Sequence, residues 1–476
     1  MPSQPRKDDL GQDPCTMTVS ALTRCYRSGA LSPVEAVRAA LDRIDRGNGP
    51  VNAFSLLLPD EALAQARASE ERWRRGTPLG RLDGVPTSIK DLTRMRGHPT
   101  LMGSRIVDAS GPWTEDAPAT AALRDAGAVF LGKTTTCEFG WKGVTDSPLC
   151  GITRNPWDLA RTPGGSSGGA AAAVALGMGH LALGGDGGGS IRIPASFTGV
   201  FGLKPGAGRV PYYPPSAIGT LSHVGPIARC VEDAALMLAV MARRDPRDWL
   251  AQPDTDPGSL LDGLQSGVAG LRVGFSPDLG CAAPDPDVAA AFKAAVSVFG
   301  MLGAEPRPVD IRLDARPLYE TLASAGKTRR YLMLSDAQRR LADPGYVAMA
   351  ERGLGVGLQA YLAAEEARTE MGMAVNALFR DIDVLLTPTM PLTAFAAGCD
   401  VPPGSGLSRW TDWNPYTPPF NLTGNPAASI PCGQDAAGLP VGLQIVGDRY
   451  ADATVLRAAA AFESARPFPL PPFPPA

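Results

Sequence analysis

Gly165–Pro194 reads GSSGGAAAAVALGMGHLALGGDGGGSIRIP and places two serines, Ser166 and Ser190, on glycine-rich backbone 24 positions apart. An alanine-rich segment that closes at Gly177 predicts a helix between them, and the short apolar run 181–183 predicts a strand. One helix followed by one strand can return the chain to the same end of a sheet. We therefore expect the two hydroxyls to meet there, on backbone that other groups can approach closely.

Outside this stretch, helical and extended segments alternate along the chain. Ser32–Glu35 has an N-cap serine, a proline at the first helical position and a glutamate at the third, which predicts a helix start. A second helix is expected from Asp285-Pro286, with Gly300 as its C-cap. Short apolar runs predict strands at 128–131, 271–275 and 384–386. Strands that alternate with helices indicate an α/β architecture.

The composition is that of a globular chain with balanced charges. Its 476 residues exceed what one hydrophobic core usually serves, which predicts two domains or one unusually large layered domain. The 45 Lys and Arg against 48 Asp and Glu give a net charge of −3, so no nucleic-acid partner is expected. With 44% hydrophobic and 20% charged residues, the chain can fill a large core.

Eight cysteines form no C-x-x-C pair and the N-terminus does not resemble a signal peptide, so we expect free thiols in a reducing cytoplasm. Gly168–Gly185 carries no charge over eighteen positions, but it is mostly Gly and Ala and is interrupted by His180. It is too weakly apolar to predict a transmembrane segment, so no membrane partner is expected. With three histidines and no H-E-x-x-H pattern, we expect no metal and no other cofactor.

Two short motifs in the same region suggest other chemistries. Gly127–Thr134, GAVFLGKT, fits the phosphate-loop pattern, but its four middle residues are themselves a strand candidate, whereas a phosphate loop lies between a strand and a helix. Nucleotide binding is therefore the weaker interpretation. Gly164–Gly168 fits the G-x-S-x-G nucleophile elbow, which needs a histidine base downstream. Only His180 and His223 follow, and each is more easily explained as a loop or core histidine.

The segment from Gly164 to Pro194 resembles the motif of the amidase signature family, G-G-S-S-G-G, a helix, then G-T-D-x-G-G-S-I-R-x-P. Further blocks similar to that family lie at 84–91, 132–139, 155–158, 199–205, 225–229, 421–426 and 438–444. The resemblance implies an α/β fold with one large twisted mixed β-sheet core flanked by α-helices on both sides. It also implies a single domain over residues 1–476, with a motif core at about 81–209, a variable substrate-pocket region at about 245–420 and a Pro-rich tail at 467–476.

The chemistry that the resemblance implies is amide cleavage by a serine nucleophile, a second serine that relays its proton, and a lysine base. Glycine amides without side chains can crowd around a carbonyl oxygen and act as an oxyanion hole. The expected site residues are Lys90, Ser166 and Ser190 as catalytic groups, Gly187, Gly188 and Gly189 as oxyanion hole, and Ser167 and Asp186 as loop support.

With histidine scarce, Lys90 is the candidate base, and a lysine accepts a proton only when it is neutral. Its pKa must then fall towards about 7–8, through burial or nearby positive potential. Lys90 lies among apolar neighbours, and the helix expected after residue 169 would aim its positive N-terminal end at the site. The resemblance also implies a cis peptide bond between Ser166 and its neighbour.

Some positions depart from the family pattern or leave specificity open. Gly185 replaces the usual threonine before the aspartate, and Gly187 follows it, so this loop is expected to be more mobile or to be shaped by other neighbours. Val210–Pro215 and Trp410–Phe420 are pocket candidates or, equally, packed turns.

The expected function is a free-standing serine hydrolase of amide C–N bonds, with aryl or alkyl carbamates and esters as further substrates because they present a similar carbonyl. The alternative is the glutaminase-type A subunit of an amidotransferase. That branch usually reads Asn-Met-Asp-Glu-Phe-Ala-Met-Gly-Ser-Ser where this chain has Thr135–Gly143, TTCEFGWKG. The expected partner is a small-molecule amide or carbamate, with a homo-oligomer left open.

Overall fold

The computed structural model describes residues 12–254 and 256–473. Its centre is a mixed sheet of eleven strands in the order β1-β3-β2-β6-β8-β7-β12-β13-β11-β9-β10, beside a two-stranded β4-β5 ribbon. The strands are β1 (Phe54–Leu57), β2 (Pro86–Lys90), β3 (Val129–Thr134), β4 (Asp146–Ser147), β5 (Gly151–Ile152), β6 (Leu181–Asp186), β7 (Phe201–Lys204), β8 (His223–Ala228), β9 (Arg272–Phe275), β10 (Glu305–Pro308), β11 (Val384–Pro388), β12 (Ala427–Gln434) and β13 (Pro440–Gly447). That residues 1–476 form a single domain stays a prediction, and the continuous sheet supports it.

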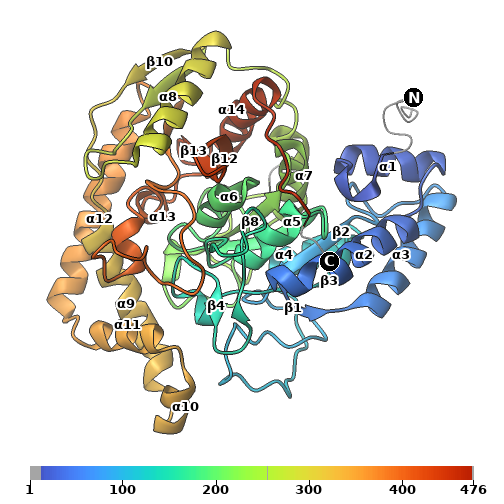
Figure 1. Cartoon of the computed structure of the whole chain (residues 1–476), viewed down its shortest axis with the longest axis horizontal. Coiled ribbons are helices and arrows are strands. Elements are labelled where there is room, and N and C mark those ends of the chain that lie inside the picture. Colours follow the sequence, from blue (N-terminus) through green and yellow to red (C-terminus); the bar gives the residue numbers. More distant parts are fainter. Residues whose placement is uncertain (1–11, 255, 474–476) are drawn as a thin grey trace.

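Helices surround the sheet, so the predicted α/β fold is confirmed. They are α1 (Val19–Ser28), α2 (Pro33–Val51), α3 (Pro59–Arg74), α4 (Pro118–Asp125), α5 (Gly168–Ala175), α6 (Arg192–Thr198), α7 (Val231–Met241), α8 (Pro286–Met301), α9 (Arg316–Leu332), α10 (Asp336–Leu341), α11 (Pro344–Leu354), α12 (Leu358–Leu378), α13 (Pro418–Leu422) and α14 (Asp452–Ala465). The N-terminal helices α1–α3 (blue) and the helices α9–α12 (orange) lie on opposite sides of the molecule (Figure 1).

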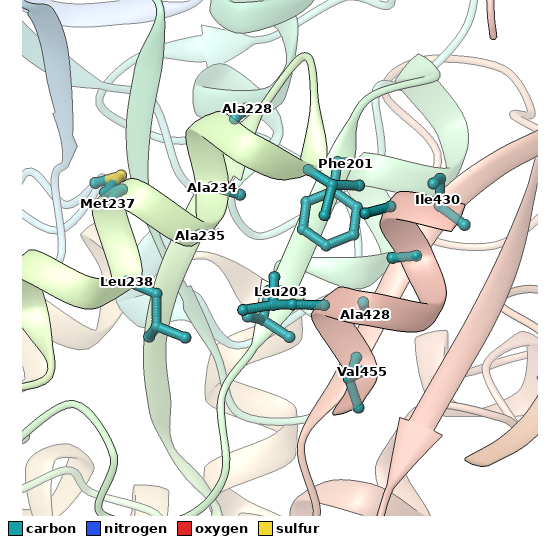
Figure 2. Packing of buried hydrophobic residues seen from close by; sticks show 14 of the residues in the cluster. Phe201, Leu203, Ala228, Ala234, Ala235, Met237, Leu238, Ala428, Ile430 and Val455 are labelled. Carbon is teal, nitrogen blue, oxygen red and sulfur yellow. The ribbon is translucent and has the colours of Figure 1, made fainter. Parts of the chain in front are cut away.

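Neighbouring residues of the central strands face opposite layers of helices. In β6, Leu181 and Leu183 pack in the cluster that includes α7 and α14, whereas Ala182 packs with α5 and α6. Figure 2 shows the first of these layers, in which Phe201 and Leu203 of β7 lie between α7 and α14. Because side chains alternate across a strand, burial on both faces requires apolar residues at successive positions.

The two helices that the sequence predicts in most detail form close to their expected positions. α2 begins with its capping box intact, since Ser32 and Glu35 each accept a hydrogen bond from the other's backbone N–H. α8 runs through Gly300 and ends at Met301, so the predicted C-cap is wrong. The left-handed turn comes later, at Gly303 (φ +85°), where the absence of a side chain removes the steric penalty.

The phosphate-loop interpretation of Gly127–Thr134 is wrong. Residues 129–134 form β3, which pairs with β1 and β2 inside the sheet. The buried Lys133 Nζ lies 2.7 Å from the Asp91 carboxylate and 2.8 Å from the Pro99 carbonyl oxygen. Because the backbone and the lysine are both engaged within the protein, this segment does not form a cradle for phosphate.

The last described residues fold back onto the N-terminal helices. The Phe473 ring lies against α2, with its centre 5.4 Å from the guanidinium carbon of Arg43 and 5.3 Å from that of Arg46. Residues 467–473 of the Pro-rich tail contain no helix or strand, and residues 474–476 lie outside the described residues.

Three further findings concern the described ranges 12–254 and 256–473. No helix in them is long and apolar enough to cross a membrane. They contain no group of three or more His, Cys, Asp or Glu side chains that could hold a metal ion. All eight cysteines are free thiols.

Candidate active site

One edge of the sheet brings the predicted catalytic residues together. Lys90 is the last residue of β2 and Asp186 the last of β6, and these two strands run parallel side by side. Their carboxyl ends therefore open at the same edge, as in other sheets with parallel strands. Ser166 lies just before α5, and Ser190 follows β6 by four residues. The helix and strand predicted between the two serines are confirmed as α5 and β6.

The Lys90 side chain ends between two serine hydroxyls. Its Nζ lies 2.8 Å from the Oγ of Ser166 and 2.8 Å from the Oγ of Ser167. It also donates to the carbonyl oxygen of Gly185 at 3.2 Å. The Gly165–Ser166 peptide bond is cis, as the resemblance implies. Lysine and proposed relay serine are thus in direct hydrogen-bond contact, while Ser167 contacts the same amine.

Lys90 is a buried amine without a carboxylate partner. Its side chain is fully buried, and it forms no ion pair with a described residue. Burial lowers the pKa of Lys90 to about 7, and the negative charge of Asp186 offsets only part of this effect. The N-terminus of α5 at Gly168 adds positive potential at the same place. A large fraction of Lys90 is therefore neutral near pH 7 and able to accept a proton.

Ser166 and Ser190 line the same cavity, and Ser190 is 8% exposed. All residues of the pocket candidate Val210–Pro215 except the first form part of its wall. The other candidate, Trp410–Phe420, does not reach this wall. The variable region predicted at about 245–420 contributes only three residues to it, from α9 and α11.

Asp186 holds the glycine loop between β6 and α6. Its buried carboxylate accepts hydrogen bonds from the N–H groups of Gly189 at 2.7 Å and Ile191 at 3.2 Å, and from side chains of Arg192 at 3.0 Å and Asn421 at 2.9 Å. Burial raises the pKa of Asp186, but Arg192 and Asn421 outweigh burial and hold the pKa well below its usual range. An ionised Asp186 therefore ties both ends of the loop together.

These contacts change the predicted oxyanion hole. The N–H of Gly189 donates to Asp186 and is not available to a substrate oxygen, so its inclusion is wrong. The N–H groups of Gly187, Gly188 and Ser190 donate to no acceptor among the described residues. Gly187 and Ser190 also line the cavity. The candidate oxyanion hole therefore consists of these three amides, including the Ser190 amide, which the sequence did not single out.

Two residues of the Trp410–Phe420 segment hydrogen-bond to the glycine loop between β6 and α6. Asn414 Nδ2 and Thr417 Oγ1 each donate to the carbonyl oxygen of Gly188 at 2.7 Å. They lie 226 and 229 positions further along the chain, so no local pattern pairs them with the loop. Asn421, in contrast, falls within the block 421–426 that carries the resemblance, and this block is the signal that could have found it.

The histidines do not form a serine–histidine pair. His223 lines the cavity, but its Nδ1 lies 3.0 Å from the Leu221 carbonyl oxygen and its Nε2 bonds no described residue. His180 and His98 bond a backbone carbonyl and a glutamate elsewhere. Within the described residues no histidine hydrogen-bonds Ser166 or Ser190, so the geometry does not support a nucleophile elbow with a histidine base.

A Gly188→Ala substitution should reduce kcat about 10²–10³-fold, the usual cost of losing one oxyanion donor. The added Cβ would lie 2.6 Å from Cζ of Tyr319 and closer still to its hydroxyl oxygen, so the loop must move. Steady-state kinetics on an anilide measure the loss. Gly372→Ala, on α12 with open space around the added carbon, is the matched control. A Gly188→Ala enzyme with unchanged kcat contradicts the assignment, and Tyr319→Leu in the same chain should restore part of the activity.

The chain matches the family model Amidase over residues 35–456. It is 40% identical over 461 residues to the A subunit of glutamyl-tRNA(Gln) amidotransferase from Gloeobacter violaceus, covering 91% of this chain and 93% of that protein. A bacterial aryl acylamidase of the amidase signature family has a TM-score of 0.88 at 32% identity, covering 95% of this chain and 96% of that one. The A subunit of glutamyl-tRNA(Gln) amidotransferase from Thermotoga maritima has a TM-score of 0.80 at 30% identity, covering 98% and 100%.

The fold, the glycine loop and the match to the family model together identify a serine amidohydrolase, an enzyme that acts on amide carbon–nitrogen bonds. The chain belongs to the amidase family, as the resemblance predicts.

Proposed function

We propose that this enzyme hydrolyses amides through an acyl-enzyme on Ser190, with Ser166 and Lys90 carrying the proton. The observation that supports this most directly is the 2.8 Å contact between the buried Lys90 amine and the Ser166 hydroxyl, at the wall of the cavity that Ser190 shares. A serine hydroxyl is a weak nucleophile until a base accepts its proton, and Lys90, which contacts Ser166, is the candidate base.

The proposed cycle moves one proton back and forth. The Ser190 oxygen attacks the carbonyl carbon while its proton passes to Ser166, whose own proton passes to neutral Lys90. The carbonyl oxygen becomes negative and is held by the amides of Gly187, Gly188 and Ser190. The C–N bond then breaks as Lys90, through Ser166, returns the proton to the leaving nitrogen. Water repeats the same steps on the acyl-enzyme and releases the acid.

Two substrate assignments have separate support. Four in ten residues are identical to the A subunit of an amidotransferase, which favours the glutaminase alternative over the free-standing hydrolase and brings with it a partner complex. The aryl acylamidase neighbour, at a TM-score of 0.88, supports the free-standing hydrolase. Carbamate and ester hydrolysis rests only on the shared carbonyl chemistry. The eight free cysteines support the proposed cytoplasmic compartment.

Hydrolysis of a small substrate panel by the purified chain tests the proposal. The panel holds a 4-nitroanilide, a primary amide, glutamine and an aryl carbamate. A fluorophosphonate probe, which phosphonylates a reactive serine with loss of fluoride, reports the nucleophilicity of Ser190 independently of substrate choice. Anilide turnover with a labelled Ser190 supports the free-standing hydrolase, and turnover of glutamine alone supports the glutaminase. A chain that neither turns over the panel nor reacts with the probe refutes the proposal.

The pH dependence of kcat/KM should follow the titration of Lys90. Because only the neutral amine accepts a proton and its pKa lies at about 7, kcat/KM for a neutral anilide should fall about tenfold per pH unit below pH 7 and level off above it. A pH–rate profile from about pH 5 to about pH 9 measures this limb. A profile that is flat across neutrality, or an acid limb near pH 4 typical of a carboxylate, speaks against a lysine base.

A further inference from the structure

Two cations stand in the wall of the catalytic cavity, and the proposed proton relay uses neither of them. Lys327 and Arg330 lie three positions apart on α9, so their side chains share one face of the helix. Both line the cavity that Ser166 and Ser190 also line. They come from the helical layer drawn in orange in Figure 1, whereas the two serines come from the central sheet edge.

Neither cation forms an ion pair or a side-chain hydrogen bond with a carboxylate in the described part of the chain, although the charge of Glu138 attracts Arg330. Lys327 is 6% exposed, and its amine forms no hydrogen bond or ion pair with a described residue. The Arg330 guanidinium carbon lies 4.4 Å from the centre of the Phe139 ring, a contact with a π-face instead of a carboxylate. Burial lowers the pKa of Lys327 to about 8 and also lowers the pKa of Arg330. Two neighbouring cations that are largely removed from water without a bound anion are unfavourable, and groups with such perturbed pKa values cluster at functional sites.

The carboxylates near this pair are already engaged. Glu138, the residue before the Phe139 ring, accepts hydrogen bonds from the Ser104 hydroxyl and from the backbone N–H of Asp343, both in buried positions. Among the described residues, Asp186 is the one carboxylate in the cavity wall, and it accepts hydrogen bonds from Arg192 and Asn421. The cavity therefore offers two cations to an anion but no free carboxylate to an ammonium group.

We propose that the substrate is an amide that carries a carboxylate group and no neighbouring ammonium group, with the carboxylate bound between Lys327 and Arg330. This inference rests on the proposed amide hydrolysis at Ser190 and names its substrate class. Because glutamine is a zwitterion, this substrate class selects the free-standing hydrolase over the glutaminase alternative. Two cations on one helical turn can bind one carboxylate with charge-assisted hydrogen bonds, which are stronger than neutral ones. The arrangement favours a monoamide of a dicarboxylic acid, or an amide whose amine part carries the acid, over a zwitterion.

Matched anilides test this charge selection. The 4-nitroanilides of glutaric acid, pentanoic acid and γ-glutamate differ at the far end of the acyl part, which is anionic, neutral and zwitterionic respectively. N-acetyl-4-aminobenzoate and N-acetyl-4-toluidine place the same contrast in the amine part. We expect the wild-type kcat/KM to be about 10- to 100-fold higher for one of the two anionic substrates than for its neutral match. A hydrogen bond to a charged group contributes a factor of about this size. The γ-glutamyl compound should fall below the glutaryl compound.

Variants then assign the preference to the two residues. Lys327→Met and Arg330→Met should each lower kcat/KM for the anionic substrate about 10- to 100-fold and leave the neutral match within about fivefold. Lys327→Arg keeps the positive charge and should keep most of the preference. Arg329→Met, on the same helix but exposed, is the control for a lost surface charge. Free glutarate should slow probe labelling of wild-type Ser190 if the acyl part of the substrate carries the acid, and free 4-aminobenzoate should slow it if the amine part does. Either acid should slow labelling less in the two Met variants.

The outcomes separate this inference from the proposed function. If wild type turns over neutral and anionic amides equally and neither acid slows labelling, the anion site is refuted while amide hydrolysis stands. If both Met variants lose neutral and anionic turnover alike, the two residues serve structure and the inference is also refuted. If Ser190 is neither labelled nor needed for turnover, the proposed function itself fails and this inference fails with it.

Discussion

Ser190→Ala is expected to lower amide hydrolysis at least about 10⁴-fold, because removal of a nucleophile leaves only binding and oxyanion stabilisation. The same variant should take up no fluorophosphonate, and mass spectrometry of intact protein measures both adducts and acyl-enzyme. The fold should not suffer, since Ser190 is 8% exposed and its hydroxyl forms no hydrogen bond with a described residue. We therefore expect a melting temperature close to that of wild type.

A matched control separates the nucleophile from serines in general. Ser69 on α3 is fully buried, and its hydroxyl has no hydrogen-bond partner among the described residues. Ser69→Ala should therefore change neither hydrolysis nor labelling. If Ser190→Ala keeps hydrolysis within about tenfold of wild type, no acyl-enzyme on this residue carries the reaction.

The parts of the site that lie close together in the sequence could be predicted, because local rules govern them. Ser166, Ser190 and the helix and strand between them occupy 25 consecutive residues with glycine at each turn. The N-terminus of α2 follows from four residues that satisfy each other's backbone groups. The phosphate-loop interpretation of Gly127–Thr134 failed although it rested on a local motif. Its residue types fit a phosphate loop, but residues 129–134 form the strand β3.

What the sequence did not predict depends on contacts between distant segments. The amide of Gly189 looks like its neighbours in sequence, and only the folded loop shows that Asp186 accepts its hydrogen bond. Thr417 reaches the carbonyl of Gly188 from 229 positions away. Lys327 and Arg330 fall outside every block that carries the resemblance, so only the packing of α9 against the cavity brings them to the serines.

Lys90→Met is expected to lower kcat about 10²–10⁴-fold, the usual contribution of a positioned general acid and base. Methionine is close to lysine in length and leaves the Ser166 and Ser167 hydroxyls in place, but it cannot accept a proton. Probe labelling of Ser190 should slow with hydrolysis, because both reactions need a deprotonated hydroxyl. Lys293→Met, an exposed lysine on α8, is the control and should behave as wild type.

The pH profile of the residual activity decides whether Lys90 is the base. A second buried amine, Lys204, also has its pKa lowered to about 7 by burial, and it donates to the carbonyl oxygens of Pro205 and Asn425, which are not part of the proposed proton relay. If Lys90 is the base, the acid limb near pH 7 disappears in Lys90→Met while the slow residual reaction continues. A limb that persists unchanged would instead assign the titration to another group, such as Lys204 or Lys327, and remove Lys90 from the proton relay.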